Sequence, residues 1–374
     1  MRIMLILEAS GGGAGRHVAD LARGLLDAGD EVHLIYSSRR MDEGFFNGIA
    51  DTRLKCYDIP MRRGPHVTDL SVLRKVWNIV HTYGPFDVIH SHSSKAGLIG
   101  RLVSSRSSVK CYTPHCIFTM DRTRSRPMKF LGWMVERALA MITHRMIAVA
   151  ESERDHLLAC YFPASIVEYI PNGVTMNFVK TQDQCRRNFG IEAGKFVFGS
   201  IARLVPQKNP ELLIRAFEKV AAVNPDVVLL LVGTGELEDR CRLLAQELSI
   251  FDRIIWAGYR SAEDSLPAFD VFVMSSRYEA FPYVLIESLA AGLPVIATAV
   301  GGTTETIEEG RNGYLIHNDS VDDLAQSMAR LASNAVLRDD FSVRSLEKSA
   351  DFSASCMVKR TRHLYQKMLS NRSR

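Results

Sequence analysis

Residues 196–232 read FVFGSIARLVPQKNPELLIRAFEKVAAVNPDVVLLLV. Two short apolar runs, Phe196–Ala202 and Val227–Val232, flank a stretch at 210–222 whose apolar residues recur at helical spacing. Unbroken apolar runs are typical of strands that are covered on both faces, as in a parallel sheet. The segment therefore predicts a strand, a helix and a second strand that lies parallel to the first.

The same alternation continues on both sides of this segment. Further strands are predicted at Arg2–Leu7, Glu31–Tyr36, Leu54–Ile59, Phe86–His90, Lys110–Thr113, Met146–Ala150, Arg253–Trp256, Val271–Met274 and Val295–Ala299. Further helices are predicted near 16–28, 68–83, 94–104, 127–143, 151–159, 236–248, 282–291, 320–334 and 352–369. Because the pattern occurs twice, it predicts an α/β protein with two doubly wound, Rossmann-like domains.

The turn Pro171-Asn172-Gly173 lies between the two occurrences of the pattern. We expect an N-terminal domain over residues 1–172, a C-terminal domain over 173–351, and a cleft between them. A last helix at about 352–370 is expected to pack back onto the first domain. The length of 374 residues suits two domains of roughly 150–200 residues each.

The composition is that of an ordinary globular protein, with 47% hydrophobic and 24% charged residues. The net charge of +4 gives no support to nucleic-acid binding, and the seven cysteines form no C-x-x-C pair, which fits reduced thiols in the cytoplasm. The first apolar run stops at Glu8, as suits a buried strand better than a signal peptide, and no apolar run could span a bilayer. We expect a cytoplasmic protein that at most contacts the inner face of the cytoplasmic membrane.

Positive charge is concentrated in the first half of the chain. Residues 1–170 carry 22 Lys and Arg against 17 Asp and Glu, a net +5, whereas the remainder carries 24 against 25, a net −1. The basic runs are Arg39-Arg40, Arg62-Arg63 and Arg122/Arg124/Arg126/Lys129, with Phe130, Leu131, Trp133 and Met134 beside the last. They form either an ordinary solvated surface or a surface for anionic lipid and a polyprenol-diphosphate-linked acceptor.

A glycine-rich loop, Ser10-Gly11-Gly12-Gly13-Ala14-Gly15, follows the first predicted strand. Its backbone N–H groups can approach an anion at the start of the next helix. A dinucleotide-binding fingerprint is not formed, because Arg16 and Val18 stand where its third glycine belongs and the second strand ends without an acid. The loop is therefore a candidate phosphate-binding loop, or a tight turn that binds nothing.

Two cations stand in the loop that follows the first strand of segment 196–232. Arg203 and Lys208 precede Asn209 and Pro210, which suit the cap and the first turn of the next helix. Two cations fixed at the carboxyl edge of a sheet can hold a pyrophosphate by charge-assisted hydrogen bonds worth about 1.5–3 kcal/mol each. The alternative is a pair of ordinary surface cations.

Two glutamates bound the segment EAFPYVLIE, residues 279–287. Pro282 suits position N1 of a helix that is apolar nearly all round. Glu287 is the only charge on that helix, so its carboxylate needs a partner or a polar ligand such as the two hydroxyls of a ribose. Glu279 lies before the helix, where orphan N–H groups favour a carboxylate. A capping Glu279 and a salt-bridged Glu287 are the purely structural alternative.

These residues carry a resemblance to a known family. EAFPYVLIE, the following AAGLPVIAT, and the R-x-x-x-x-K of Arg203 and Lys208 resemble the family-four retaining glycosyltransferases of the GT-B fold, with their E-x7-E motif. The loop GGGAGRHV and the segment IPNGV resemble the same family in the same order. DVIHSHSSKAGLIGRL and TPH are similar to members that build bacterial surface polysaccharides. The similarity extends over most of the chain.

The resemblance implies a retaining transfer from a nucleotide-diphosphate sugar, UDP- or GDP-linked, to a hydroxyl of a glycan or lipid-linked saccharide. It implies that the catalytic residues are Glu279, His115, Lys208 and Arg203. It implies donor binding by Gly12, Gly13, Arg203, Lys208, Glu279, Phe281, Pro282, Glu287, Gly301, Gly302 and Thr303. On the acceptor side we expect His90, His92, Lys95 and Asn172. This chain departs from the family where Gly15 and Thr175 replace acids that the family often has, which leaves acceptor details open.

No cofactor is expected beyond the donor, and no metal. No D-x-D occurs, so Arg203 and Lys208 would stabilise the leaving diphosphate in place of an ion held by carboxylates. His90-x-His92 could chelate a metal, but no third ligand stands at a recognisable spacing. Two other classes stay open: a GT-B-fold epimerase or phosphorylase, and a non-catalytic nucleotide-sugar-binding module.

Overall fold

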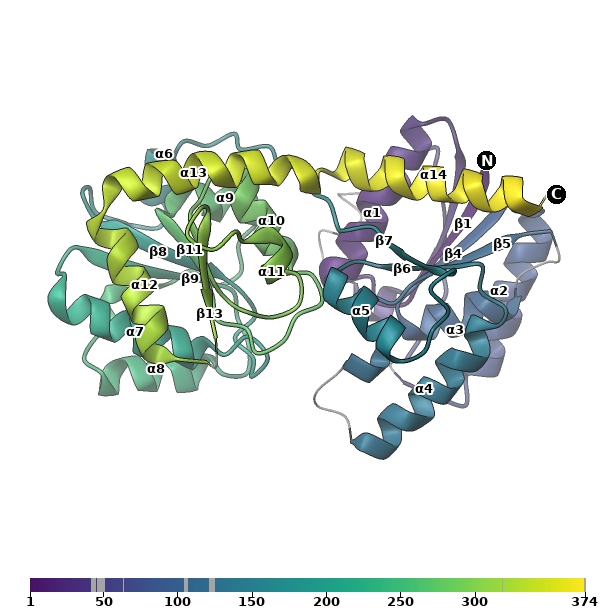
Figure 1. The fold of residues 1–374 in the computed structure, drawn as a ribbon, viewed down its shortest axis with the longest axis horizontal. Coiled ribbons are helices and arrows are strands. Elements are labelled where there is room, and N and C mark those ends of the chain that lie inside the picture. The colour runs from purple at the N-terminus through teal and green to yellow at the C-terminus, as the bar shows by residue number, and fades with distance from the viewer. Residues whose placement is uncertain are drawn as a thin grey trace. The chain divides into compact units, whose positions relative to one another are not determined.

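The structure is a computed structural model, and it describes residues 1–41, 45, 51–62, 64–103, 107–120, 125–317 and 319–372. Arg63, Arg122 and Arg124 of the predicted basic runs lie outside the described residues. The chain divides into two compact units. The first unit contains Met1–Gly173 and Ser353–Arg374, and the second contains Val174–Phe352. The fold of each is drawn in Figure 1.

The first unit is built on a parallel sheet with the strand order β3-β2-β1-β4-β5-β6-β7 (Figure 1). Its strands are β1 (Arg2–Leu7), β2 (Glu31–Tyr36), β3 (Lys55–Asp58), β4 (Val88–His92), β5 (Val109–Thr113), β6 (Arg145–Ala148) and β7 (Val167–Tyr169). Its α-helices are α1 (Gly12–Asp27), α2 (Asp69–Tyr83), α3 (Ser94–Val103), α4 (Arg126–Ala140), α5 (Glu151–Ala159) and α14 (Ala354–Arg372). The strand order reverses between β1 and β4, and doubly wound sheets bind ligands beyond the carboxyl ends of strands at such a switch point.

The second unit repeats this design in the order β10-β9-β8-β11-β12-β13. Its strands are β8 (Phe196–Ile201), β9 (Val227–Val232), β10 (Ile254–Trp256), β11 (Val271–Met274), β12 (Val295–Thr298) and β13 (Gly313–Ile316). Its α-helices are α6 (Gln182–Asn188), α7 (Pro210–Val223), α8 (Glu238–Glu247), α9 (Ala262–Ser265), α10 (Tyr283–Ala290), α11 (Thr303–Thr306), α12 (Val321–Ser333) and α13 (Ala335–Ser349). The switch point lies between β8 and β11. The predicted fold class of two doubly wound α/β domains is confirmed.

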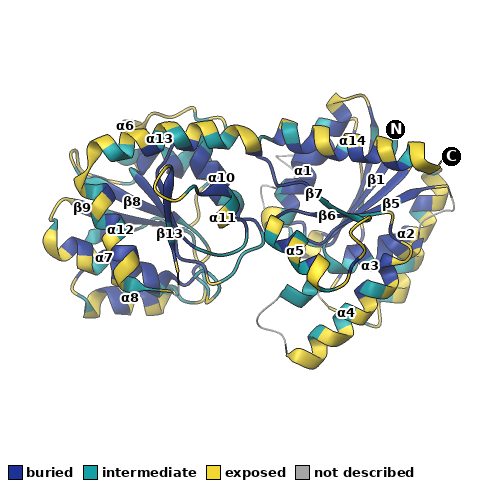
Figure 2. Cartoon of the chain, viewed as in Figure 1, coloured by how far each residue is buried: buried dark blue, intermediate teal, exposed yellow. Residues whose placement is uncertain are grey.

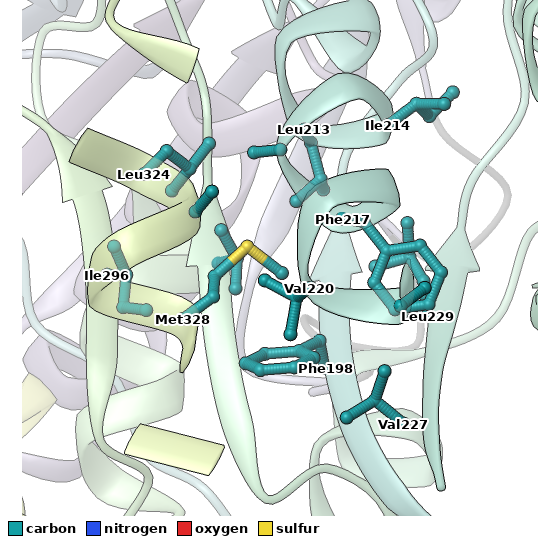
Figure 3. Packing of buried hydrophobic residues seen from close by; sticks show 14 of the residues in the cluster. Phe198, Leu213, Ile214, Phe217, Val220, Val227, Leu229, Ile296, Leu324 and Met328 are labelled. Carbon is teal, nitrogen blue, oxygen red and sulfur yellow. The ribbon is translucent and has the colours of Figure 1, made fainter. Parts of the chain in front are cut away.

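The core of the second unit fills the space between its sheet and the helices α7 and α12. Figure 3 shows Phe217 and Val220 of α7 and Met328 of α12 lying over Phe198 of β8. All four side chains are at most 2% exposed. Burial of each such side chain stabilises the fold by about 1.5–3 kcal/mol, so this layer fixes the strands whose ends carry the site.

The core of the first unit includes the last helix of the chain. Helix α14 packs on α1, where a Cβ added to Gly24 would lie 2.6 Å from Cγ2 of Val358. Tyr365 of α14 is fully buried within the same apolar cluster as strands β1, β2 and β4. In Figure 2 the central strands, such as β1 and β8, are largely dark blue, and yellow is found on the outer faces of the helices. The first unit therefore takes part of its core from the C-terminus of the chain.

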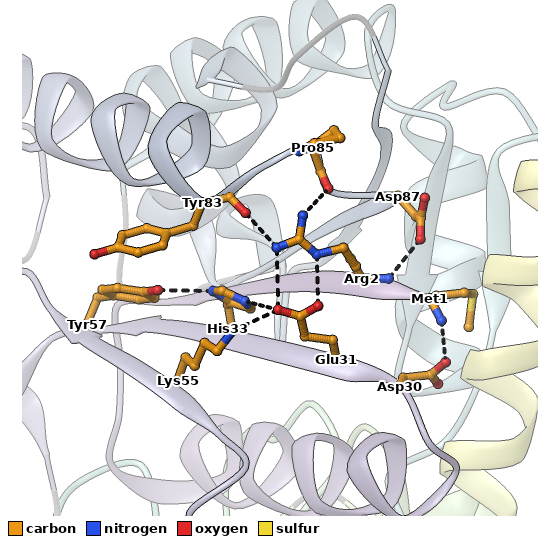
Figure 4. A network of polar contacts seen from close by, with 10 residues as sticks. All are labelled: Met1, Arg2, Asp30, Glu31, His33, Lys55, Tyr57, Tyr83, Pro85 and Asp87. Carbon is orange, nitrogen blue, oxygen red and sulfur yellow. Dashed lines mark hydrogen bonds and ion pairs between the residues drawn. The ribbon is translucent and has the colours of Figure 1, made fainter.

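Charged side chains join the amino ends of β1, β2 and β3 (Figure 4). Nε of Arg2 donates to Glu31 at 2.9 Å, and Nζ of Lys55 donates to the same carboxylate at 2.8 Å. The Arg2 guanidinium also donates to the carbonyl oxygens of Tyr83 and Pro85, at 2.8 and 3.1 Å. The hydrogen bonds from Arg2, with those from His33 and Lys55, hold the pKa of Glu31 well below its usual range.

Several element boundaries differ from the predicted ones. Strand β4 begins and ends two residues later than the predicted Phe86–His90, because Ser91 and His92 still pair with Ile6 and Leu7 of β1. Helix α1 begins at Gly12, four residues before its predicted start. The sequence did not predict strands β7 and β13 or helices α6, α9, α11 and α13. The two strands read VEY and GYLI, so neither is the unbroken apolar run by which the other strands were recognised.

Among the described residues, no helix combines the length and the hydropathy that crossing a membrane requires.

Candidate functional site

The loops that follow β8 and β11 meet beyond the switch point of the second sheet. Lys208, in the first loop, donates from Nζ to Oε1 of Glu279, in the second, at 2.5 Å. The two side chains are 16% and 10% exposed. Two residues that the sequence singled out from different motifs therefore form one ion pair.

Hydrogen bonds between the same two loops fix the main chain under this pair. Oγ of Ser275 donates to the carbonyl oxygens of Lys208 and Asn209, both at 2.9 Å. Nε2 of Gln207 donates to the carbonyl oxygen of Tyr278 at 3.0 Å. Because both loops are tied to one another at their backbones, the ion pair does not depend on two freely moving side chains.

The start of α7 agrees with the sequence in position but not in detail. Asn209 is the N-cap residue and Pro210 follows it as the first helical residue. Asn209 adopts a left-handed conformation with φ of 49°, and its side chain makes no capping hydrogen bond. Its Oδ1 instead accepts a hydrogen bond from Nη2 of Arg277 at 3.3 Å. Arg203, two residues beyond β8, is exposed.

Helix α10 carries the second glutamate of the E-x7-E motif. Pro282 occupies the N-cap position, so its predicted place at N1 is wrong by one residue. Glu287 is only 7% exposed, in a helix where Leu285 and Ile286 are fully buried. Phe281 is also buried, with its ring centroid 5.5 Å from that of Phe352. The donor contacts expected of Glu287, Phe281 and Pro282 stay predictions.

The loop Gly301-Gly302-Thr303 follows β12 and packs against the segment before α10. Gly302 has φ of +77°, and a Cβ at this position would lie 2.9 Å from Cα of Phe281. Both the backbone conformation and the lack of space therefore require glycine here. Oγ1 of Thr303 accepts from the backbone N–H of Val300 at 2.9 Å and donates to its carbonyl oxygen at 2.7 Å. The Thr303 hydroxyl therefore closes the turn, and donor binding by this loop stays a prediction.

In the first unit, the glycine-rich loop forms the turn that opens α1. Gly12 and Gly13 are exposed residues of the first helical turn, with Gly11 as N-cap. A Cβ at Gly15 would lie 2.3 Å from the carbonyl oxygen of Ser10, so a larger residue would open the turn. The first turn of α1 carries no acid, which leaves the positive end of the helix dipole available to an anion.

Three imidazoles converge beyond the switch point of the first sheet. One ring nitrogen from each of His17, His92 and His115 lies within 4.8 Å of the other two. Nδ1 of His92 is 3.2 Å from Nε2 of His115, and the rings of His17 and His115 meet edge-on with centroids 4.7 Å apart. We call these three residues the imidazole cluster. The sequence paired His92 with His90 instead and did not identify His17.

Burial favours the neutral form of all three imidazoles. It lowers the pKa of His17 to about 4, against an opposing hydrogen bond with Asn172, whose Oδ1 lies 2.9 Å from Nδ1 of His17. Burial also lowers the pKa of His92 and of His115 well below the usual value, and the neighbouring imidazoles add to this effect. The cluster is therefore a group of neutral donors and acceptors at neutral pH.

The remaining residues predicted on the acceptor side are tied to other partners. His90 lies behind the cluster, with Nδ1 2.5 Å from the hydroxyl of Tyr365 and Nε2 2.8 Å from Oγ1 of Thr113. Nζ of Lys95 donates to Asp69 at 2.7 Å, and its side chain is 8% exposed. The structure thus brings Asn172 and His92 together with His17 and His115, and the ring of His90 lies against that of His92 with centroids 4.0 Å apart. Lys95 is paired with Asp69 instead.

Glu153 of α5 accepts hydrogen bonds from the turn that contains His115. The sequence analysis did not identify Glu153 as a residue of the site. His115 and Cys116 adopt left-handed conformations with φ of 54° and 82°. One oxygen of the fully buried Glu153 carboxylate accepts from the backbone N–H groups of Cys116 and Ile117, both at 2.9 Å, and the other accepts from that of Val149 at 3.0 Å. In the sequence, Glu153 belongs to the charged stretch ESERD and resembles a solvated helix face.

Comparison with known proteins identifies families for both units. Residues 11–178 match the family described as Glycosyltransferase Family 4, and residues 181–347 match the family described as Glycosyl transferases group 1. Together the two matches extend over most of the chain.

Curated relatives are also glycosyltransferases. The chain is 27% identical over 285 residues to the UDP-Gal:alpha-D-GlcNAc-diphosphoundecaprenol alpha-1,3-galactosyltransferase of Escherichia coli, over 72% of this chain and 73% of that protein. It is 27% identical over 384 aligned positions to the D-inositol 3-phosphate glycosyltransferase of Kribbella flavida, over 91% of this chain and 87% of that protein.

Solved structures share the fold at low identity. Anabaena HepE, solved in complex with UDP and glucose, superposes with a TM-score of 0.85 at 21% identity, over 98% of this chain and all of HepE. A glycosyltransferase from Rickettsia africae superposes with a TM-score of 0.83 at 18% identity, over 99% of both chains. The predicted GT-B fold is confirmed, and the protein is a glycosyltransferase whose first unit belongs to family 4 and whose second belongs to the glycosyl transferases of group 1.

Proposed function

We propose that the protein transfers a sugar from a UDP- or GDP-linked donor to a hydroxyl of a glycan or lipid-linked saccharide, with retention of the anomeric configuration. The pathway we propose is assembly of a bacterial surface polysaccharide, such as exopolysaccharide, O-antigen, lipopolysaccharide or capsule. The observation that carries the proposal is the Lys208–Glu279 ion pair beyond the switch point of the second sheet. The proposed reaction uses no cofactor besides the donor.

The ion pair suits a diphosphate leaving group. As the bond to the sugar breaks, negative charge grows on the diphosphate and positive charge grows on the sugar. Lys208, together with the exposed Arg203, would stabilise the diphosphate. Once Lys208 turns to the phosphate, Glu279 loses its partner and its carboxylate is available to the positive sugar. Glu287 would accept the ribose hydroxyls.

We assign the acceptor to the first unit. His92 and Asn172 lie with His17 and His115 beyond the switch point of its sheet, and their neutral polar atoms suit hydroxyl groups. We assign His115 to the reacting sugar as the family resemblance implies. The acceptor hydroxyl would pass its proton to the departing phosphate on the same face of the sugar, a route consistent with retention.

The acceptor we propose is linked to a polyprenol diphosphate. The E. coli relative is named for a diphosphoundecaprenol acceptor. Helix α4 exposes the apolar side chains of Met128, Phe130, Leu131 and Met134 at 50–64%, beside the exposed Arg126. Apolar side chains with cations at their edge suit an anionic membrane surface. We therefore propose a peripheral contact with the inner face of the cytoplasmic membrane.

A donor screen followed by a transfer assay tests the function. UDP-, GDP- and dTDP-sugars are compared for thermal stabilisation, and the best donor is incubated with a synthetic polyprenyl-diphosphate saccharide. We expect one nucleotide to raise the melting temperature and the product to keep the anomeric configuration by NMR. Product from the donor alone would indicate an epimerase or phosphorylase, and binding without turnover would indicate a binding module.

The membrane contact has its own test. Co-sedimentation with anionic vesicles at low salt is expected for the wild type and reduced in a Phe130→Ser/Leu131→Ser variant. Exposed apolar residues away from α4 provide the matched control, Val336→Ser on α13, which is 81% exposed. Equal recovery of all three proteins with the vesicles, or of none, would contradict a contact through α4.

A further inference from the structure

We propose that His17, His92 and His115 bind Zn²⁺, and that the bound ion inhibits the transferase by occupying His115. The binding stands on the geometry of the first unit alone, whereas the inhibition rests on the proposed function. The ion would regulate the enzyme and take no part in the transfer, which is proposed to use no metal.

The spacing of the ring nitrogens suits a tetrahedral ion. Zn–N bonds of about 2.0–2.1 Å place two ligand nitrogens about 3.4 Å apart. Nδ1 of His92 and Nε2 of His115 are already 3.2 Å apart, so an ion can bridge them in place of their mutual hydrogen bond. The nitrogen of His17 lies within 4.8 Å of both, and it reaches the ion by a ring movement of about 1 Å.

Hydrogen bonds around the cluster set which nitrogens face it. Nδ1 of His17 is 2.9 Å from Oδ1 of Asn172, so this nitrogen carries the proton and leaves a lone pair on Nε2. Histidine ligands commonly donate their second ring N–H to such a partner, which fixes the tautomer and the ring orientation. Both nitrogens of His90 are engaged, by Tyr365 and Thr113, so His90 is excluded as a fourth ligand.

The cluster also holds a buried polar atom that no described residue satisfies. Nε2 of His92 is buried and has no hydrogen-bond partner in the part of the chain that the structure describes. Such atoms are rare in folded proteins because they lose their hydrogen bonds to water without replacement. The polar environment of His92 is therefore incomplete with the described protein groups alone.

The chemistry of the ligand set selects the ion. Three neutral imidazoles with an open fourth position are a ligand set that Zn²⁺ uses in proteins, with water as the fourth ligand. Mg²⁺ and Ca²⁺ prefer oxygen ligands and should not compete. His115 is partly exposed, so the fourth position is open to solvent or to a substrate group. Because Glu153 fixes the turn at residues 115–117, a bound ion holds His115 away from its proposed role.

The binding test uses the metal-free full-length protein and Zn²⁺ by calorimetry, with Co²⁺ as a spectroscopic probe. We expect one equivalent of Zn²⁺ to bind and Co²⁺ to give the visible absorption of a tetrahedral site. His17→Gln and His92→Gln should each weaken binding by more than about 100-fold, and Asn172→Ala by about 10–100-fold. His81→Ala removes an exposed histidine of α2 as the matched control and should bind as the wild type does.

The inhibition test adds Zn²⁺, and then EDTA, to the transfer assay of the wild type and of His81→Ala. Loss of transfer with Zn²⁺ at the calorimetric affinity, and recovery with EDTA, are expected. The proposal is wrong if the wild type binds no equivalent of Zn²⁺, if Mg²⁺ binds equally well, or if His17→Gln and His92→Gln both keep the wild-type affinity. Circular dichroism of each variant separates a lost site from a lost fold. A protein that binds Co²⁺ but transfers no sugar would contradict the proposed function and leave the ion site intact.

Discussion

Beyond the switch point of each sheet lies a small group of polar side chains, and the two groups are chemically opposite. In the first unit the group is made of imidazoles whose charged forms are disfavoured by burial. In the second unit it is an ion pair, Lys208 with Glu279, whose side chains keep 16% and 10% of their exposure. The switch point of the first sheet therefore carries neutral side chains, and that of the second sheet carries charged ones. The fold supplies the place, and the residues in the loops supply the chemistry.

The two groups are also supported differently. The ion pair rests on side chain to backbone hydrogen bonds between two loops, such as those of Ser275. The imidazole cluster depends on a strained turn at His115 and on a buried carboxylate beneath it. Lys208 and Glu279 can change partners when a ligand arrives, whereas the turn at His115 is fixed by backbone hydrogen bonds to the buried Glu153. We expect mutations to affect chiefly activity in the second unit and both stability and activity in the first.

The largest effect on stability should follow replacement of the buried Glu153 in the first unit. Glu153→Ala leaves three backbone N–H groups without their acceptor, and we expect it to lower the free energy of unfolding by about 3–5 kcal/mol. Thermal or urea unfolding measures the change. Glu151→Ala, an exposed glutamate in the same helical turn, is the matched control and should change stability by less than about 0.5 kcal/mol. Equal losses of unfolding free energy in the two variants would show that Glu153 does not stabilise the turn.

Replacement of Lys208 in the second unit should lower catalytic activity without lowering the stability of the fold. Lys208→Ala removes the charge proposed to stabilise the leaving diphosphate, and kcat should fall about 10²–10³-fold, or about 3–4 kcal/mol. Steady-state transfer assays and a melting curve are measured together. Lys219→Ala removes an exposed lysine that is paired with Asp322 in the same unit, and it should keep full activity. A loss of activity that matches a loss of folded protein would overturn the contrast between the units.

Low pH should lower the stability of the first unit more than that of the second. The pKa of His17 is lowered to about 4 in the folded protein, so between that value and the ordinary value near 6.5 the unfolded chain binds more protons. Stability of the first unit therefore falls as the pH drops through this range, by up to about 3 kcal/mol for His17 alone. Hydrogen exchange in the presence of EDTA should show α1 and β4 losing protection before β8 and β11. Parallel loss in both units would contradict the assignment, and His17→Gln should flatten the dependence.

The smallest effect is expected at the amino edge of the first sheet. Glu31→Gln leaves Arg2 and Lys55 without a charged partner, and because Glu31 is 38% exposed we expect a loss of only about 0.5–1 kcal/mol. The loss should shrink in high salt, which screens such pairs, and denaturant titrations at two salt concentrations measure it. A loss as large as that of Glu153→Ala would show that exposed charges contribute as much to this unit as the buried carboxylate does.

Much of the fold was predictable because the strands are short apolar runs and the helices between them show an amphipathic period. The predicted limits of β1, β2, β9 and β11 agree with the structure at both ends. The predicted end of β4 was wrong because Ser91 and His92 are polar, and only their pairing with β1 keeps them in the strand. Short strands such as β7 and β13 depend on their neighbours in the sheet, which a local pattern does not contain.

The two halves of the candidate site were not equally predictable. Lys208 and Glu279 follow recognisable strands, and their meeting follows from the rule that loops at a switch point converge. His17 lies 75 positions before His92, on a helix face that shows only an ordinary amphipathic pattern. Glu153 looks like a solvated glutamate because its partners are backbone N–H groups, which have no sequence signature. The sequence thus indicated charged side chains in the loops after strands more readily than it indicated side chains that fix the main chain, such as Glu153.

The position of α14 has a consequence for how the protein is made. The second unit is one continuous stretch, Val174–Phe352, whereas the first is completed by residues after Ser353. Tyr365, whose hydroxyl lies 2.5 Å from Nδ1 of His90, is synthesised after the whole of the second unit. On the ribosome the second unit can therefore finish folding while the first, although begun earlier, still lacks part of its core. A stop codon directly after the codon for Phe352 would leave the second unit whole and the first incomplete.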